Sequence, residues 1–195
     1  MDVQLLETLV KKYHSLGLPF ARAIAESEPV DGGILDDFER RVCPLPVELR
    51  QLYLWKNGVS DSWIRKGADM LPGFFFEPFE RSARELFRKR GEGSLRFEFL
   101  VDFGGGVYYV PIGDGYCGSS PVFSFSPVLS HDFRHYDSVE KMILTLIQLF
   151  DCSVFVNEDG DMEWDDEKDR LTDKISSKLN PQSEYWKRRV MGIYD

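Results

Sequence analysis

The most concentrated chemistry in this 195-residue sequence is a run of carboxylates between Asp151 and Asp169. Lys168 is the one basic residue in this range, so the segment carries a formal charge of −8, against −9 for the whole chain. Such a dense negative field attracts metal ions or basic macromolecules. The nine acidic residues of the run are Asp151, Glu158, Asp159, Asp161, Glu163, Asp165, Asp166, Glu167 and Asp169.

A calcium site in this run fails the spacing test of an EF-hand loop. That loop needs Gly at its sixth position and a carboxylate at its first. Aligning Gly160 with the sixth position places Phe155 at the first, where it offers no ligand atom. A looser metal site stays open, but charge runs usually face water, so we expect a solvated acidic turn and no metal.

Two histidines, His131 and His135, have the four-residue spacing that places metal ligands on one face of a helix. Pro127 and Phe133 make this segment resemble a loop, and Asp132 stands where the HExxH motif of zinc proteases needs Glu. We therefore expect structural or surface histidines there.

Catalytic and cofactor motifs are also absent from the sequence. It has no GxSxG elbow, and Cys43 between Val42 and Pro44 is predicted to be a buried apolar position. The letters of a dinucleotide-binding GxGxxG occur at 113–118, but a strand pattern follows where the phosphate-binding helix should begin. Carboxylate pairs among Asp69, Asp102 and Asp114 are expected by chance in an acidic domain. The sequence thus predicts no enzyme and no cofactor.

The elements that must position these residues follow from apolar spacing. Repeats at three and four residues predict helices over 5–13, 20–26, 35–42, 45–53, 80–90, 138–150 and 167–179. Strands are predicted over 97–103, 107–112 and 121–125, and the Asp159-Gly160 step suggests a turn between short strands at 152–156 and 162–164. Since no helix separates the first three strands, we expect an antiparallel sheet covered by helices, an α+β fold.

Composition narrows the functional classes further. A pI near 4.9 argues against a general nucleic-acid binder, which needs a basic face, and favours a basic partner or good solubility. No apolar stretch approaches the roughly 18 residues of a membrane helix. Three widely spaced cysteines without a CxxC pair and the absence of a signal-like N-terminus predict a cytoplasmic protein.

Several short motifs, taken in order, resemble the SUKH superfamily, which joins bacterial immunity proteins to fungal cell-wall-assembly regulators. The residues that carry the resemblance are Ile34–Glu39, Leu45-Pro46, Leu49, Leu52-Tyr53, Asn57-Gly58, Phe99–Val110, Pro121–Phe125, Ser138–Ile143, Asp159-Gly160, Asn180-Pro181 and Tyr185-Trp186. The position after Gly106 departs from the pattern, since Val107 stands where a polar residue is expected. We divide the chain into a helical cap over 1–30 and a SUKH-like domain over 31–195, which includes the acidic segment 151–169 and a closing helix.

The resemblance implies a non-enzymatic binding protein, most simply an immunity protein that neutralises a toxin domain such as a basic nuclease. An acidic inhibitor would imitate the nucleic acid that such a toxin attracts, and its field would speed association. A regulatory scaffold of the SUKH type without a toxin partner is the alternative. The oligomeric state stays open.

The partner-binding residues that we expect combine the acidic field with two aromatic anchors. Trp164 lies inside the acidic segment, and Trp63 follows Asp61 in a separate loop. The opposing interpretation is that both Trp side chains are half-buried core and that the acids only confer solubility. The candidate residues are Asp61, Trp63, Glu158, Asp159, Asp161, Glu163, Trp164, Asp165 and Asp166.

Overall fold

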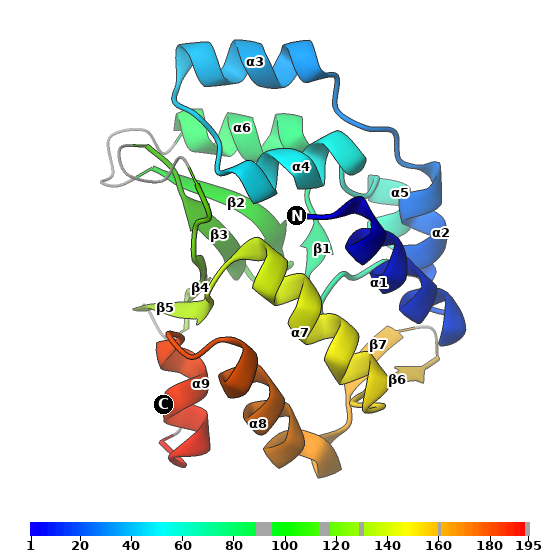
Figure 1. Cartoon of the computed structure of the whole chain (residues 1–195). Helices are drawn as coiled ribbons and strands as arrows, with labels where there is room; N and C mark the ends of the chain where they lie inside the picture. The colour runs from blue at the N-terminus through cyan, green and yellow to red at the C-terminus, as the bar shows by residue number, and fades with distance from the viewer. Residues whose placement is uncertain (89–94, 114–117, 129–130, 160, 194–195) are drawn as a thin grey trace.

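A five-stranded antiparallel sheet organises the chain in the computed structural model, which describes residues 1–88, 95–113, 118–128, 131–159 and 161–193. Its strands follow chain order: β1 (Phe75–Phe76), β2 (Arg96–Val101), β3 (Val107–Pro111), β4 (Val122–Ser126) and β5 (His131–Tyr136). A separate hairpin pairs β6 (Phe155–Glu158) with β7 (Asp161–Trp164). The predicted α+β class, with a meander of antiparallel strands, is therefore confirmed (Figure 1).

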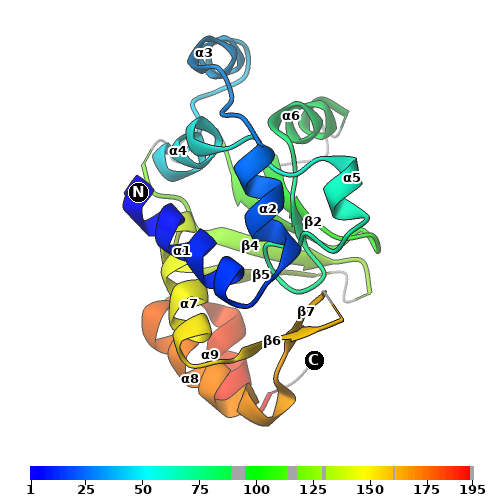
Figure 2. The same ribbon diagram turned by 90° about the vertical axis from the view of Figure 1, so that its right-hand side faces the viewer.

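Nine α-helices in the described part of the chain surround the sheet, and a short 3-10 helix, η1 (Asp166–Lys168), follows the hairpin. The α-helices are α1 (Val3–Ser15), α2 (Pro19–Glu26), α3 (Gly32–Arg41), α4 (Val47–Trp55), α5 (Asp61–Ile64), α6 (Phe79–Arg88), α7 (Val139–Asp151), α8 (Asp169–Leu179) and α9 (Glu184–Val190). Figures 1 and 2 show α1 alongside α7, with α3 and the α8–α9 pair at opposite ends of the molecule.

The N-terminal helices share the core of the rest of the chain. Leu6, Leu9 and Tyr13 of α1 are at most 1% exposed and belong to the same apolar cluster as Ile143 and Leu146 of α7. The region predicted as a helical cap over 1–30 thus packs directly against the domain that follows it.

The central helix α7 begins where the sequence predicts. The Ser138 side chain accepts a hydrogen bond from the Lys141 N–H at 3.1 Å, which satisfies one of the free donors of the first turn. Its buried stripe includes Met142, Ile143 and Leu149. This stripe lies on the core side of the helix, so α7 buries one long apolar face as its spacing requires.

Two elements overturn predictions from the sequence. Residues His131–Tyr136 form the edge strand β5, not a loop, because the segment pairs with β4 and buries Phe133 and His135. Residues Glu184–Val190, where the sequence predicts no helix, form α9, because the Ser183 side chain caps it and Trp186 is buried in the core.

Smaller differences have local causes. Strand β2 ends at Val101, before Phe103, because the Asp102 carboxylate accepts a hydrogen bond from the Gly106 N–H at 2.7 Å and closes a turn. Helix α5 lies in a segment predicted as loop. Cys43 is half-buried, not buried, since it lies in the connection before α4.

Candidate functional site

The β6–β7 hairpin forms where the sequence predicts two short strands, although the first strand covers 155–158 and not 152–156. Gly160, the second residue of the predicted turn, lies outside the described residues. Asp159 has a positive φ of 54°, a conformation that Asp tolerates better than most residues. The strands pair Phe155 with Trp164 and Glu158 with Asp161. Figure 2 shows the hairpin at the periphery of the molecule, after the end of α7.

The register separates the hairpin into two faces. Since alternate residues point to opposite faces, Phe155, Met162 and Trp164 share one face, and Glu158, Asp161 and Glu163 share the other. Phe155 and Met162 are 2% exposed, whereas the three acidic residues are exposed. Asp159 at the turn is also exposed, so one face of this small element presents four carboxylates to water.

The structure distinguishes the acidic residues by whether a cation neutralises them. Asp151 pairs with Lys12, Asp165 with Lys168 at 2.9 Å, and Asp169 with Arg189 at 3.3 Å. The other six have no ion pair within the described residues; they are Glu158, Asp159, Asp161, Glu163, Asp166 and Glu167. Four of these six uncompensated carboxylates therefore belong to the hairpin, and the other two follow it in η1.

Asp69 extends this uncompensated charge beyond the hairpin. It precedes β1 in sequence, and its carboxylate accepts a hydrogen bond from the Gly73 N–H at 3.1 Å. Burial raises the pKa of Asp69 from its usual value, the Gly73 bond opposes this, and the charges of Asp161 and Glu163 raise it further. No pattern in the sequence singles out Asp69, because it lies about ninety residues before the hairpin.

Trp164 lies on the inner face of the hairpin, away from the outward carboxylates. Its ring packs against Phe155 with 4.8 Å between ring centroids, and it is partly buried against the core. The same side chain also lines a cavity of about 330 Å³. Trp164 therefore packs partly against the core and partly lines the cavity.

Asp165, another predicted contact residue, already has local partners. Its carboxylate caps η1 by accepting from the Glu167 N–H at 3.1 Å, and it pairs with Lys168. Asp166, one residue later, is exposed and lines the cavity beside Trp164. Of the two neighbouring carboxylates, Asp166 is the one available to a partner.

The second predicted pair, Asp61 and Trp63, lies on α5 and is largely engaged within the chain. Asp61 pairs with Arg81. The Trp63 Nε1–H donates to Glu26 at 2.6 Å, and the Lys66 ammonium lies 4.3 Å from the Trp63 ring centre. Trp63 lines a different hollow of about 290 Å³, so the structure does not unite this pair with the hairpin face.

The cavity beside the hairpin is built by segments that are far apart in the sequence. It lies between the loop before β1, strands β3 and β5, the β7–η1 connection, and helices α8 and α9. Six rings line it, from Phe74, Tyr108, His135, Trp164, Tyr185 and Trp186. Burial, with help from the charge of Arg189, lowers the pKa of His135 to about 3, so this ring is neutral at physiological pH.

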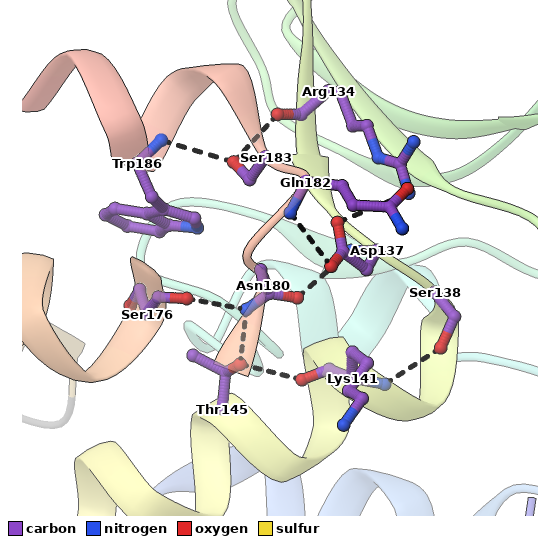
Figure 3. A network of polar contacts seen from close by, with 10 residues as sticks. All are labelled: Arg134, Asp137, Ser138, Lys141, Thr145, Ser176, Asn180, Gln182, Ser183 and Trp186. Atoms are coloured by element: carbon purple, nitrogen blue, oxygen red, sulfur yellow. Dashed lines mark hydrogen bonds and ion pairs between the residues drawn. The ribbon is translucent and has the colours of Figure 1, made fainter. Parts of the chain in front are cut away.

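A buried polar network fixes α8 and α9 against the sheet and α7 (Figure 3). The Asn180 amide donates to Thr145 Oγ1 at 2.9 Å and to the Ser176 carbonyl at 3.0 Å, and its oxygen accepts from the Asp137 N–H at 3.0 Å. Ser183 donates to the Arg134 carbonyl at 2.9 Å. These contacts hold the helices that form one wall of the cavity.

The two histidines considered as metal ligands lie on β5. Four residues along a strand span about 13 Å, too far for one metal ion to bind both rings. Among the described residues, no group of three His, Cys, Asp or Glu side chains is placed to hold a metal. The glycine motif at 113–118 lies mostly outside the described residues, and β4 follows it rather than a helix.

No protein-family model matches the chain, and a search of curated proteins finds no matching relative. None of the helices in the described ranges combines the length and apolar character that a membrane crossing requires.

Proposed function

We propose that this protein is a non-enzymatic, cytoplasmic binding protein of the SUKH type, and that it neutralises a basic toxin domain by direct contact. The observation that carries the proposal is the outward face of the β6–β7 hairpin. Its carboxylates, Glu158, Asp159, Asp161 and Glu163, lack cations within the described residues, and Asp69 adds to their field.

This arrangement of carboxylates does not stabilise the hairpin. Glu158 and Asp161 lie directly opposite each other in the strand register, and like charges in that position destabilise a hairpin. A solvated surface that serves only solubility has no need to concentrate uncompensated charge on one short element. A surface that must attract a basic partner does need this concentration.

The elements that carry the SUKH resemblance support the fold part of the proposal. Ile34–Glu39 lies in α3, Leu49 and Tyr53 in α4, Phe99–Val110 over β2 and β3, and Ser138–Ile143 at the start of α7. Short motifs that resemble one family in order therefore fall on separate, regular elements of an α+β domain. A basic nuclease is the toxin class that this acidic face would suit best, because a nuclease site attracts polyanionic phosphate.

The test is partner capture from a host lysate at low salt with three forms of the chain. The first is wild type, and the second carries Glu158→Gln, Asp161→Asn and Glu163→Gln. The third is a matched control with the same change of net charge at exposed residues elsewhere, namely Asp2→Asn, Glu28→Gln and Glu184→Gln. Asp159 is left unchanged because its positive φ would strain most replacements.

We expect wild type and control to retain one basic protein that a salt step releases, and the hairpin variant to lose it. The purified partner should be a toxin whose activity wild type inhibits at equimolar concentration. Equal retention by all three forms would contradict the acidic-face mechanism. Several neutral housekeeping partners without salt dependence would instead support the regulatory scaffold.

A further inference from the structure

We infer that the cavity beside the hairpin is a binding pocket for a guanidinium group, supplied by an arginine side chain of the protein partner. The inference rests on the proposed function and deepens it, because it names the group that the partner would insert. It starts from three observations on one cavity of about 330 Å³, namely its rings, its charge and an unmet hydrogen-bond donor.

The rings supply the right surface for a planar cation. Phe74, Trp164 and Tyr185 come from three distant segments, and each is only partly buried although it lines the cavity. Guanidinium groups stack on aromatic faces, and they carry a weaker hydration shell than ammonium groups, so they enter such sites more readily. The chain itself uses this pairing elsewhere, since the Arg96 guanidinium lies 4.9 Å from the centre of the Tyr109 ring.

The charge of the lining also favours a cation. Arg189, the basic residue in the wall, is already neutralised by Asp173 at 2.6 Å and Asp169 at 3.3 Å. His135 is neutral and adds no opposing charge. Asp166 lines the same cavity without an ion pair among the described residues, so an unneutralised carboxylate remains for an incoming group.

One donor of the wall lacks an acceptor within the described chain. Trp186 is 3% exposed, and its buried Nε1–H forms no hydrogen bond, although its backbone N–H is satisfied by Ser183. A buried donor without a partner is unfavourable. A carbonyl oxygen next to the inserted side chain would satisfy it once the side chains that cover the indole nitrogen move aside, and an arginine residue within a peptide brings both groups together.

The position of the pocket fits a partner drawn to the hairpin. Trp164 ends β7, and Asp166 begins η1 two residues later, so the pocket adjoins the carboxylate face along the chain. Long-range attraction would bring a basic protein to the hairpin, and the pocket would then hold a single side chain at short range. At many protein interfaces, long-range charge speeds association while a few buried side chains supply most of the binding energy.

The experiment titrates the full chain with Nα-acetyl-arginine N-methylamide and follows the indole N–H resonances by NMR. Acetylated and amidated citrulline is the uncharged isostere, and n-butylguanidinium supplies the guanidinium without peptide carbonyls. The variant is Asp166→Asn, and its matched control is Glu167→Gln, the next residue of the same short helix, which does not line the cavity.

We expect the capped arginine to shift the Trp164 and Trp186 indole signals saturably, with Kd on the order of 1 mM. Asp166→Asn should weaken this binding roughly tenfold, while Glu167→Gln should leave it within about twofold. Weaker binding of n-butylguanidinium supports a peptide arginine as the source. Tighter binding of n-butylguanidinium overturns that source and points to a free small cation.

An equal response to citrulline, or no saturable shift, would overturn the inference. These outcomes are separable from failure of the proposed function, because the titration uses no toxin. If the hairpin variant loses the partner but the titration shows no saturable shift, the proposed function is supported and the guanidinium pocket is contradicted. If the titration shows a saturable shift but no toxin is captured, the guanidinium pocket is supported and the proposed function is contradicted.

Discussion

At the scale of single residues, His135 is a side chain of a type common in catalysis that here packs as a buried, neutral ring. Its ring stacks on Tyr185 with centroids 4.1 Å apart, and its Nδ1 lies 3.1 Å from the Ser124 hydroxyl oxygen. Arg189 is near enough for its charge to lower the pKa of His135, although burial is the larger cause. Because protonation would place a second cation in this wall, folding keeps the ring neutral.

We predict that this burial makes stability depend on pH in the acidic range. The pKa of His135 is about 3 in the folded chain and about 6.5 when unfolded, so between these values the unfolded chain binds the extra proton. The free energy of unfolding should therefore fall as pH falls through this window, by up to about 1.4 kcal/mol per pH unit. Urea unfolding at pH 7 and pH 5 measures the change.

The matched variant is His135→Gln, which keeps a polar group near Ser124 but does not titrate. It should be less stable than wild type at pH 7 and lose less stability on going to pH 5. Asp69 and Glu77, whose pKa values burial raises, change stability in the opposite direction in both proteins and so cancel in the comparison. An identical loss in the two proteins would mean that His135 is accessible to protons in the folded chain.

A second prediction concerns Asn180, which is fully buried and joins three segments. Asn180→Leu would leave the Asp137 N–H without its acceptor and the Thr145 hydroxyl oxygen without the N–H that it accepts, so we expect the free energy of unfolding to fall by ~3 kcal/mol. Gln182→Ala is the control, since Gln182 contributes its backbone N–H rather than its side chain. Thermal unfolding of both variants provides the measurement, and equal melting temperatures would contradict the role of the network.

At the scale of elements, the hairpin combines a stabilising face and a destabilising one. Phe155, Met162 and Trp164 pack inward, while Glu158, Asp161 and Glu163 repel one another outside. Its attachment to the rest of the chain is specific, because the Asn157 side chain donates to the Leu16 carbonyl at 2.7 Å. The element is therefore held in place by its inner face and its tether, in spite of its outer charges.

We predict that removing the outer charges stabilises the fold. Glu158→Gln with Asp161→Asn relieves a directly opposed like-charge pair and should raise the free energy of unfolding by about 0.5 kcal/mol. The same change at Asp165, which caps η1 and pairs with Lys168, should not raise it. Urea unfolding at low salt resolves the difference, and destabilisation by the double substitution would show that the carboxylates have a structural role.

The sequence predicted elements well where one periodic pattern decided them. Helix α7 and the strands β2 to β4 follow from apolar spacing and from glycine-rich breaks. Strand β5 was missed because its inward positions are Phe133 and His135, and the polar His hides the alternation. Helix α9 was missed because Trp186 is its one buried residue, and that burial exists only after α9 packs beside β5.

One part of the candidate site could be predicted from the sequence and the other could not. The acidic hairpin was visible because its charges and its turn are local in sequence. The cavity was not, because Phe74, Tyr108, Trp164 and Tyr185 belong to four separate segments. Its assembly depends on tertiary packing, for which spacing along the chain carries no signal.

At the scale of the whole molecule, the first thirty residues are part of the core. Tyr13 is fully buried and its hydroxyl donates to the Met70 carbonyl, and the Trp55 indole donates to Glu7 at 2.9 Å. Lys12 pairs with Asp151 at the end of α7. Helix α1 is thus joined to both the α5–β1 connection and the helix that precedes the hairpin.

We predict that deleting residues 1–16 prevents folding of the remainder. Loss of the buried Leu6, Leu9 and Tyr13 side chains would remove ~10 kcal/mol, which is comparable with the entire stability of a typical domain. Far-UV circular dichroism and a thermal scan should show no cooperative transition. Val3→Ala, at a site 52% exposed, should melt like wild type. A truncated chain with a near-normal transition would establish 1–30 as a separable cap.

The hairpin also has a consequence for how the surface of this protein would change over evolutionary time. Glu158, Asp161 and Glu163 project from a short ribbon whose inner face alone meets the core, so mutations at these three positions can accumulate without loss of the scaffold. Asp159 is different, because its left-handed backbone limits it to Asp, Asn or Gly. We therefore expect descendants to diversify at the three strand positions while the turn residue stays within that narrow set.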